Sequence, residues 1–171
     1  GLEDTFKGVI DLVEMKAVYF LDDLGNEISI TDIPDDMKNI AEEQRGVMLE
    51  KLADISDDIA MLYLEGQDVP VDMIKAAIRK GVVEMKHFPV LCGSALKNKG
   101  VQLLLDAVTY YLPSPLDVPP MMRTNPETGE QEPRVPDDSA PSSALAFKIM
   151  TDPYVGRLTF VRVYSGVLES G

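Results

Sequence analysis

The sequence predicts a mixed α/β chain followed by β-strands, and three observations support this fold class. Apolar residues recur at steps of three and four over residues 37–85, which is typical of amphipathic helices. β-Branched and aromatic residues gather at 6–30 and at 144–164, which favours strands. A short apolar run, 88–92, precedes a polar loop and a helical pattern, as in the strand–loop–helix units of α/β layers.

The first expected element is a small antiparallel sheet. Residues 6–20 are rich in valine, isoleucine and aromatic side chains and carry little helix signal. Residues 22–26, Asp-Asp-Leu-Gly-Asn, supply turn chemistry before the alternating Ile28 and Ile30. We therefore expect strands on both sides of this turn.

A long amphipathic helix, or two nearly collinear helices, is expected after Ile33. Ser56 is followed by two aspartates and is a candidate cap for a second helix, and Gly66 is the candidate stop. A third helix is expected over residues 71–85. The residues that recur at steps of three and four in the first part, and so share one helix face, are Met37, Ile40, Ala41, Gln44, Met48, Leu52, Ile55, Ile59 and Leu62.

The second half is expected to change from an α/β layer to β-structure. Residues 88–92 have the length of a buried strand, and the apolar spacing at 101–112 predicts a helix that ends at a Pro-Ser-Pro sequence. Eight prolines between Pro113 and Pro141 indicate a linker, with a surface hairpin at 127–129. Strands are expected at 144–150 and 158–164.

Composition restricts the classes of function. The net charge of −13 argues against a surface built to neutralise nucleic-acid phosphates, so any RNA contact is expected to be local. The one cysteine, Cys92, cannot form an intramolecular disulfide, and no apolar run approaches the length that a bilayer requires. A reducing cytoplasm fits these features best. Gly1 in place of Met, and Gly171 directly after a strand-like run, lead us to expect an internal segment of a longer protein.

Two side chains with reactive chemistry are assigned no role. His87 lacks a cysteine at metal-ligand spacing and is expected to be a helix-end or surface histidine. Cys92 is expected to be a small buried hydrophobic residue of the 88–92 strand rather than a nucleophile. Neither a catalytic site nor a metal site is therefore predicted.

The loop after the 88–92 strand is the most informative stretch. Ligands of open α/β sheets bind at the carboxyl ends of strands, where small side chains let backbone N–H groups approach a ligand. Ser94, Ala95 and Leu96 could donate main-chain hydrogen bonds to a planar heterocycle such as guanine. Judged by pattern alone, a Gly-Ser-Ala turn is more often ordinary loop chemistry.

Longer strings in this region resemble bacterial translation elongation factor G. They are Cys-Gly-Ser-Ala-Leu-Lys-Asn-Lys-Gly-Val-Gln at 92–102, Leu-Asp-Ala-Val at 105–108 and Tyr-Leu-Pro-Ser-Pro at 111–115. Residues 6–17 resemble the segment where an inserted subdomain of that factor begins, and residues 147–166 resemble the opening strands of its second domain. The resemblance therefore extends over the whole chain.

The resemblance implies a division of the chain into four parts. Residues 1–87 would be an inserted α+β subdomain, and 88–115 the last strand and helix of a P-loop GTPase domain. Residues 116–143 would be the linker, and 144–171 the truncated start of a β-barrel whose cut edge could pair between molecules.

The resemblance also implies a site and a reaction for the parent protein. Ser94, Ala95 and Leu96 would line the guanine pocket of an enzyme that binds GTP or GDP with Mg²⁺ and hydrolyses GTP to move tRNA and mRNA on the ribosome. The family's phosphate-binding loop, switch segments, catalytic histidine and Asn-Lys-x-Asp sequence are expected upstream of Gly1. The segment itself is thus expected to be inactive, with neither nucleotide nor metal bound.

Acidity is concentrated in one stretch. Residues 22–68 contain fourteen Asp and Glu and three Lys and Arg, a net charge of −11. Such a field attracts a basic partner, although solubility alone also explains many acidic helices. The resemblance implies docking to the ribosomal stalk protein, in a parent that also contacts rRNA and tRNA. The candidate docking residues are Glu42, Glu43, Glu50 and Asp54.

Two rival interpretations remain open. The chain could be a non-enzymatic acidic adaptor whose Gly-Ser-Ala loop is only a turn, in which case no phosphate-binding loop would precede Gly1 in the parent gene. It could instead belong to a ribosome-protection or release-factor GTPase, which shares the barrel sequence. The strings at 97–101 and 111–115 favour elongation factor G over that class.

Overall fold

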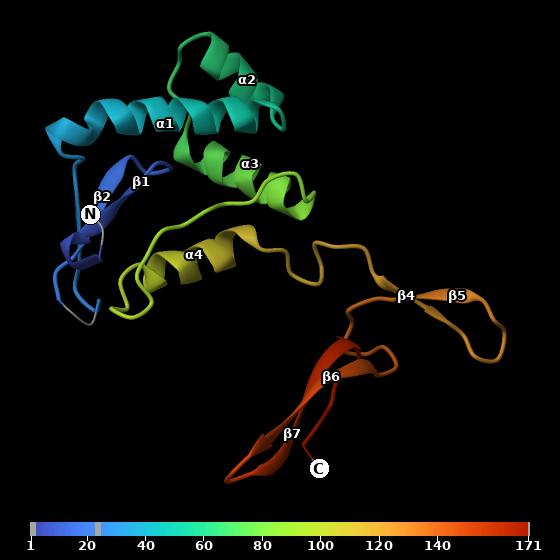
Figure 1. Ribbon diagram of the computed structural model, residues 1–171. Coiled ribbons are helices and arrows are strands. Elements are labelled where there is room, and N and C mark those ends of the chain that lie inside the picture. Colours follow the sequence, from blue (N-terminus) through green and yellow to red (C-terminus); the bar gives the residue numbers. More distant parts are fainter. Residues whose placement is uncertain (1–2, 23–24, 171) are drawn as a thin grey trace. The chain divides into compact units, whose positions relative to one another are not determined.

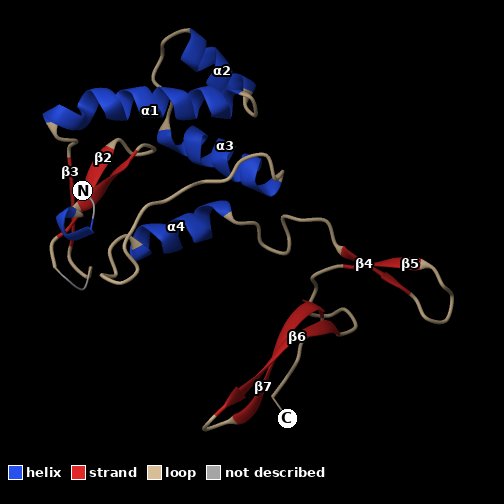
Figure 2. Cartoon of the chain, in the orientation of Figure 1, coloured by secondary structure: helices blue, strands red, loops and turns tan. Residues whose placement is uncertain are grey.

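The computed structural model describes residues 3–22 and 25–170 (Figure 1). The chain divides into two compact units, residues 1–112 and residues 113–171. The first unit is a mixed α+β structure and the second contains two antiparallel strand pairs (Figure 2). Among the described residues, no helix combines the length and the apolar character needed to cross a membrane.

The predicted N-terminal sheet is confirmed. A short 3₁₀ helix, η1 (Glu3–Thr5), precedes strands β1 (Gly8–Asp11), β2 (Lys16–Phe20) and β3 (Ile28–Thr31). They form an antiparallel sheet in the order β1-β2-β3. Its buried side chains come from β2, which lies in the middle of the sheet and so packs against neighbours on both edges.

The acidic stretch contains two helices rather than one long helix, which is one of the two predicted alternatives. They are α1 (Asp35–Ala53) and α2 (Asp57–Leu64), and Ser56 caps α2 by accepting a hydrogen bond from Ile59 N. The expectation of collinear helices is wrong, because the chain turns before Ser56 and α2 packs back against α1 (Figure 1). Gly66, at φ +67°, follows the end of α2 as predicted.

Helix α3 (Val71–Val83) completes a three-helix core with α1 and α2. Its Ile74 and the Ile59 side chain of α2 are fully buried. The predicted apolar stripe of α1 is buried only in part, since Met37 and Ile40 are 42% and 54% exposed. The core comprises Leu49, Leu52, Ile59, Val69, Ile74, Ala77 and Ile78.

The predicted buried strand at 88–92 is wrong. These residues form no strand, and the chain is exposed from Phe88 to Gly93, before the turn that leads to α4 (Val101–Tyr111). A buried strand needs a hydrogen-bonded neighbour on each edge and cover on both faces. Among the described residues, no strand pairs with this segment. Phe88 and Val90 are consequently 73% and 89% exposed.

The second unit contains two hairpins. Strands β4 (Met121–Thr124) and β5 (Gln131–Arg134) pair around the turn predicted near Gly129. Strands β6 (Ser143–Asp152) and β7 (Gly156–Ser165) pair around Asp152, which accepts hydrogen bonds from Tyr154 N and Val155 N. Both strand predictions are confirmed, and each sheet in this part of the described chain has two strands.

Candidate functional site

The predicted guanine-binding residues lie in a tight turn between the 88–92 segment and α4. Ser94 N donates to Lys99 O over 2.8 Å, and Lys99 N donates to Ser94 O over 3.0 Å. Asn98 N closes the turn by donating to Ala95 O over 3.2 Å, and Asn98 adopts φ +52°. The loop is therefore ordered by its own backbone hydrogen bonds, without a ligand.

The three predicted donors differ in availability. The Ser94 amide is engaged by Lys99 O, so it could reach a heterocycle only if that bond opened or were shared. Ala95 and Leu96 are exposed, Leu96 by 96%, and their amides donate to no other described residue. Guanine contact stays a prediction, and Ala95 and Leu96 are the residues that present free donors.

The sequence predicts that small residues near the turn let a ligand approach the backbone, but in the structure the glycines beside the turn serve the turn itself. A Cβ on Gly93 would lie 2.7 Å from Lys99 O, and a Cβ on Gly100 would lie 3.1 Å from Cys92 O. Gly100 also adopts φ +90°, which disfavours other residues. Small residues here let the two ends of the turn approach each other, before any ligand is considered.

Cys92 differs from the prediction. It was expected to be buried in a strand, but its side chain is exposed in the irregular segment before the turn. The reason is the one given for the strand: no neighbouring strand covers this segment among the described residues. The outer face of α4 is similarly open, with Leu104, Leu105 and Val108 between 44% and 59% exposed. An apolar surface thus extends along both elements that flank the turn.

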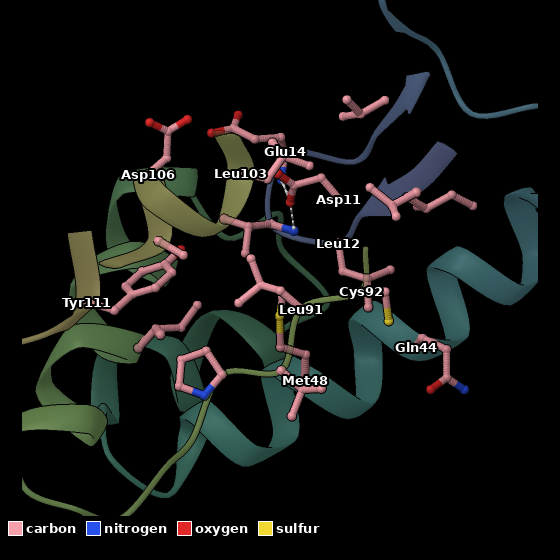
Figure 3. A pocket seen from close by; sticks show the side chains of 18 of the residues that line it. Asp11, Leu12, Glu14, Gln44, Met48, Leu91, Cys92, Leu103, Asp106 and Tyr111 are labelled. Carbon is pink, nitrogen blue, oxygen red and sulfur yellow. Dashed lines mark hydrogen bonds between the residues drawn. The ribbon is translucent and has the colours of Figure 1, made fainter. Parts of the chain in front are cut away.

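A large cleft of about 1200 Å³ lies beside this segment, within the first unit. Figure 3 shows Leu91 and Cys92 reaching into it from one side and Met48 of α1 from another. Leu103 and Tyr111 of α4 also line it. Because its lining is largely apolar, the cleft suits an apolar segment better than a charged ligand.

Two charged groups at the cleft, Lys75 and Glu14, are paired with each other. Lys75 donates to Glu14 over 2.6 Å and lies 5.0 Å from the centre of the Tyr110 ring. The hydrogen bond to Glu14 raises the pKa of the Lys75 ammonium. Asp11 accepts from Val13 N and Glu14 N, which fixes the turn after β1 (Figure 3). These interactions fix the local structure beside the cleft.

His87 lies just beyond the end of α3, as predicted, and is half-buried. Its backbone N donates to Gly81 O over 3.1 Å, and its Nδ1 is buried without a hydrogen-bond partner among the described residues. The described residues contain no cluster of His, Cys, Asp and Glu able to hold a metal ion. His87 therefore has no partner with which to act as a ligand or general base in this part of the chain.

The predicted docking acids lie on exposed positions of α1 and its C-cap. Glu42, Glu43, Glu50 and Asp54 are all exposed. Sequence reasoning missed one contact: Tyr63 of α2 donates its hydroxyl to Glu50 over 2.9 Å. This bond raises the pKa of the Tyr63 phenol. The docking role of these acids stays a prediction, and Glu50 also links α1 to α2.

Sequence reasoning also missed Gln102. Its Nε2 donates to Gly25 O over 2.7 Å, although the two residues lie far apart in the chain. Local patterns carry no signal for such a contact, because Gln102 has the spacing of an ordinary helix-surface residue.

Comparison with solved structures shows that the fold of this chain resembles part of a longer protein. The chain is similar to a protein from Thermus thermophilus known from its crystal structure, with a TM-score of 0.67 and 24% sequence identity. The similarity covers 94% of this chain and 21% of that chain, so this chain spans about a fifth of the longer protein. No family model matches the sequence. At this identity the likeness concerns the fold, a mixed α+β chain of four helices and small antiparallel sheets.

Proposed function

We propose that this chain is a segment of a translational GTPase of the elongation factor G class. In that protein, GTP binding and hydrolysis on the ribosome would drive the movement of tRNA and mRNA in the cytoplasm. The segment would supply part of the guanine pocket and a docking surface for the ribosomal stalk protein. The resemblance of residues 92–115, and the similarity to part of a much longer protein, support the proposal.

The strongest support for the proposal comes from the turn at 94–99. This turn is ordered and has hydrogen-bond donors, and both elements that flank it expose apolar side chains. The amides of Ala95 and Leu96, two exposed residues, donate to no described residue, and Phe88, Val90 and Leu105 on the flanking elements are more than half exposed. A monomeric surface rarely exposes a large contiguous apolar area. The arrangement suits a base-recognition loop at the edge of a sheet whose other strands come from the parent protein.

The residues present fit the guanine base but not the rest of the nucleotide. The amides of Ala95 and Leu96, which donate to no described residue, match an acceptor such as the guanine carbonyl. This sequence contains no Gly-x-x-x-x-Gly-Lys-Ser/Thr loop. In GTPases such a loop holds the phosphates, and the bound Mg²⁺ neutralises charge during phosphoryl transfer. Phosphate and Mg²⁺ binding are therefore assigned to other parts of the parent.

The test of the proposal is the parent protein itself. The gene that encodes this segment should also encode, before Gly1, a phosphate-binding loop and an Asn-Lys-x-Asp sequence. The full-length product should bind GDP and should hydrolyse GTP faster when ribosomes are added. A parent that has neither the phosphate-binding loop nor GDP affinity would contradict the proposal.

The isolated chain of 171 residues is expected to bind GTP weakly or not at all. The reason is that base contacts alone lack the phosphate interactions that supply much of nucleotide affinity. Titration with a fluorescent GTP analogue, monitored by anisotropy, measures this directly. Micromolar affinity would show that the segment holds a complete nucleotide site.

Stalk-protein binding by the parent is expected to weaken when Glu42, Glu43 and Glu50 are all changed to Lys. These acids lie on one exposed helix in a stretch with a net charge of −11, and charge reversal replaces attraction of a basic partner by repulsion. The dependence of affinity on salt should also decrease. Isothermal titration at two salt concentrations measures both quantities.

The control reverses three exposed acids of the second unit, Glu127, Glu130 and Asp138, which changes the net charge equally. A Tyr63→Phe variant separates the charge of Glu50 from its hydrogen bond, because it removes the bond and keeps the carboxylate. Unchanged binding in the helix variant, or an equal loss in the control, would reject α1 as the docking surface.

A second candidate function is the non-enzymatic acidic adaptor. The observation that favours it is the bond from Ser94 N to Lys99 O, which makes the turn complete without a ligand. An adaptor would bind its basic partner through α1 and would show no nucleotide dependence. Binding of the parent to the stalk protein without any GDP affinity would favour this function. A ribosome-protection or release-factor GTPase would be distinguished by the reaction that the parent stimulates on ribosomes.

A further inference from the structure

The turn at 94–99 and the helix that follows it contact Gly25, which lies between β2 and β3 of the N-terminal sheet. Gln102, in the first turn of α4, donates Nε2 to Gly25 O over 2.7 Å. Gly25 also lies against the turn itself, since a Cβ at Gly25 would be 2.1 Å from Asn98 O and 3.3 Å from Lys99 N. Two independent contacts therefore join Gly25 to the loop and to the helix that follows it.

The contacts are close and partly buried. Gly25 and Lys99 are buried, and Gln102 is half-buried. Gly25 adopts φ +67°, so both its conformation and its surroundings favour glycine. Phe20, at the end of β2, lies within van der Waals range of the Cβ position of Gly100, directly after the turn. Gly25 and Phe20 thus both contact the carboxyl end of the turn.

Of the two polar groups of the Gln102 side chain, the Nε2 group has a partner among the described residues. Its Oε1 is buried and accepts no hydrogen bond from the described residues. A buried acceptor without a partner costs free energy. Its one satisfied group is the amide donor that holds Gly25.

We propose that Gly25 and Gln102 are positioning residues that couple the inserted sheet to the base-recognition turn at 94–99. The inference rests on the proposed function, because it assumes that Ala95 and Leu96 contact the guanine base. A displacement of Gly25 would move Asn98 and Lys99 and hence the amides of the turn. Binding of a partner to the inserted subdomain could in this way alter the affinity for the nucleotide.

The first experiment measures the coupling in the 171-residue chain, independently of nucleotide. Gly25→Ala introduces a Cβ against Asn98 O, and Gly66→Ala is the matched control, with the same φ of +67° and nothing within 4 Å. Hydrogen exchange at the amides of Ser94 and Lys99 should be roughly three- to tenfold faster in Gly25→Ala, the range expected for the loss of one hydrogen bond. Equal exchange in the two variants would overturn the coupling.

The second experiment uses the full-length parent and asks whether the coupling reaches the base. Gln102→Leu keeps the size of the side chain but removes the donor to Gly25 O, and Gln67→Leu, which loses an exposed bond to Glu65, is the control. The Kd for GDP should rise roughly three- to tenfold in Gln102→Leu and not in the control.

A comparison of two nucleotides separates positioning from general destabilisation. The diphosphate of 2-aminopurine riboside lacks the carbonyl at position 6, so its affinity should not change in Gln102→Leu if the turn donates to that carbonyl. Equal losses for both nucleotides would show a merely structural effect and overturn the inference. Absence of GDP binding by the unaltered parent would instead reject the proposed function, and the exchange experiment would still decide the coupling.

Discussion

Changing Ile74 to Ala is expected to lower the free energy of unfolding of the first unit by about 3–4 kcal/mol. Ile74 is fully buried, in a core formed by α1, α2 and α3, and it packs there with Leu52 and Ile59. Removing three carbons from such a site leaves a cavity that three helices cannot close without losing other contacts. Urea denaturation monitored by far-UV circular dichroism measures the change.

The matched control is Ile40→Ala on α1, where the side chain is 54% exposed. The same atoms are removed, but little apolar area leaves the interior and alanine favours the helix, so a change below about 1 kcal/mol is expected. A similar loss in the two variants would show that the core is not packed around Ile74. If Ile74→Ala lowered the free energy of unfolding by only a small amount, the core would have repacked around the smaller side chain.

Arg45→Met is expected to destabilise the first unit by about 2–3 kcal/mol. The Arg45 guanidinium donates Nη1 to Leu12 O over 2.6 Å and to Val13 O over 2.8 Å, and Nη2 lies 3.5 Å from Val69 O. Methionine keeps most of the aliphatic stem and removes these donors, so partly buried carbonyl groups lose their partners. The turn between β1 and β2 should also exchange its amide hydrogens faster.

Lys51→Met on the same helix is the control for Arg45→Met, because it removes one positive charge from an exposed position of α1. Only the interaction with the helix C-terminus is lost there, at a cost of about 0.3–1 kcal/mol. Thermal unfolding and amide exchange report both variants. Equal destabilisation would mean that the charge of Arg45 matters and its carbonyl contacts do not.

The elements that depend on short-range physics could be predicted from the sequence. Ser56 caps α2 and Gly66 follows its end, as the pattern of a hydroxyl before two aspartates and a late glycine predicts. The three-strand sheet and the 143–165 hairpin follow from β-branched runs separated by turn residues. Each of these features is determined within a few residues of chain.

The sequence predicted where the candidate site lies along the chain, but not the structure of the site. Small residues after an apolar run indicated a loop at 94–96, and the structure has a turn there. The sequence could not show that Ser94 N is bonded to Lys99 O, because a backbone bond across a turn depends on dihedral angles that many loop sequences can adopt. Nor could it show which of the three amides remain exposed.

Two kinds of feature were decided by tertiary structure alone. The first is burial: residues 88–92 have the composition of a core strand, yet Val90 is 89% exposed, because burial requires neighbouring strands that composition cannot supply. The second is long-range contact, as between Gln102 and Gly25 and between Arg45 and the β1–β2 turn. The sequence by itself thus determined the helices, the hairpin strands, the caps and the concentration of acid in residues 22–68. Only the packing of distant segments decided which surfaces are covered and what holds the turn at 94–99 in place.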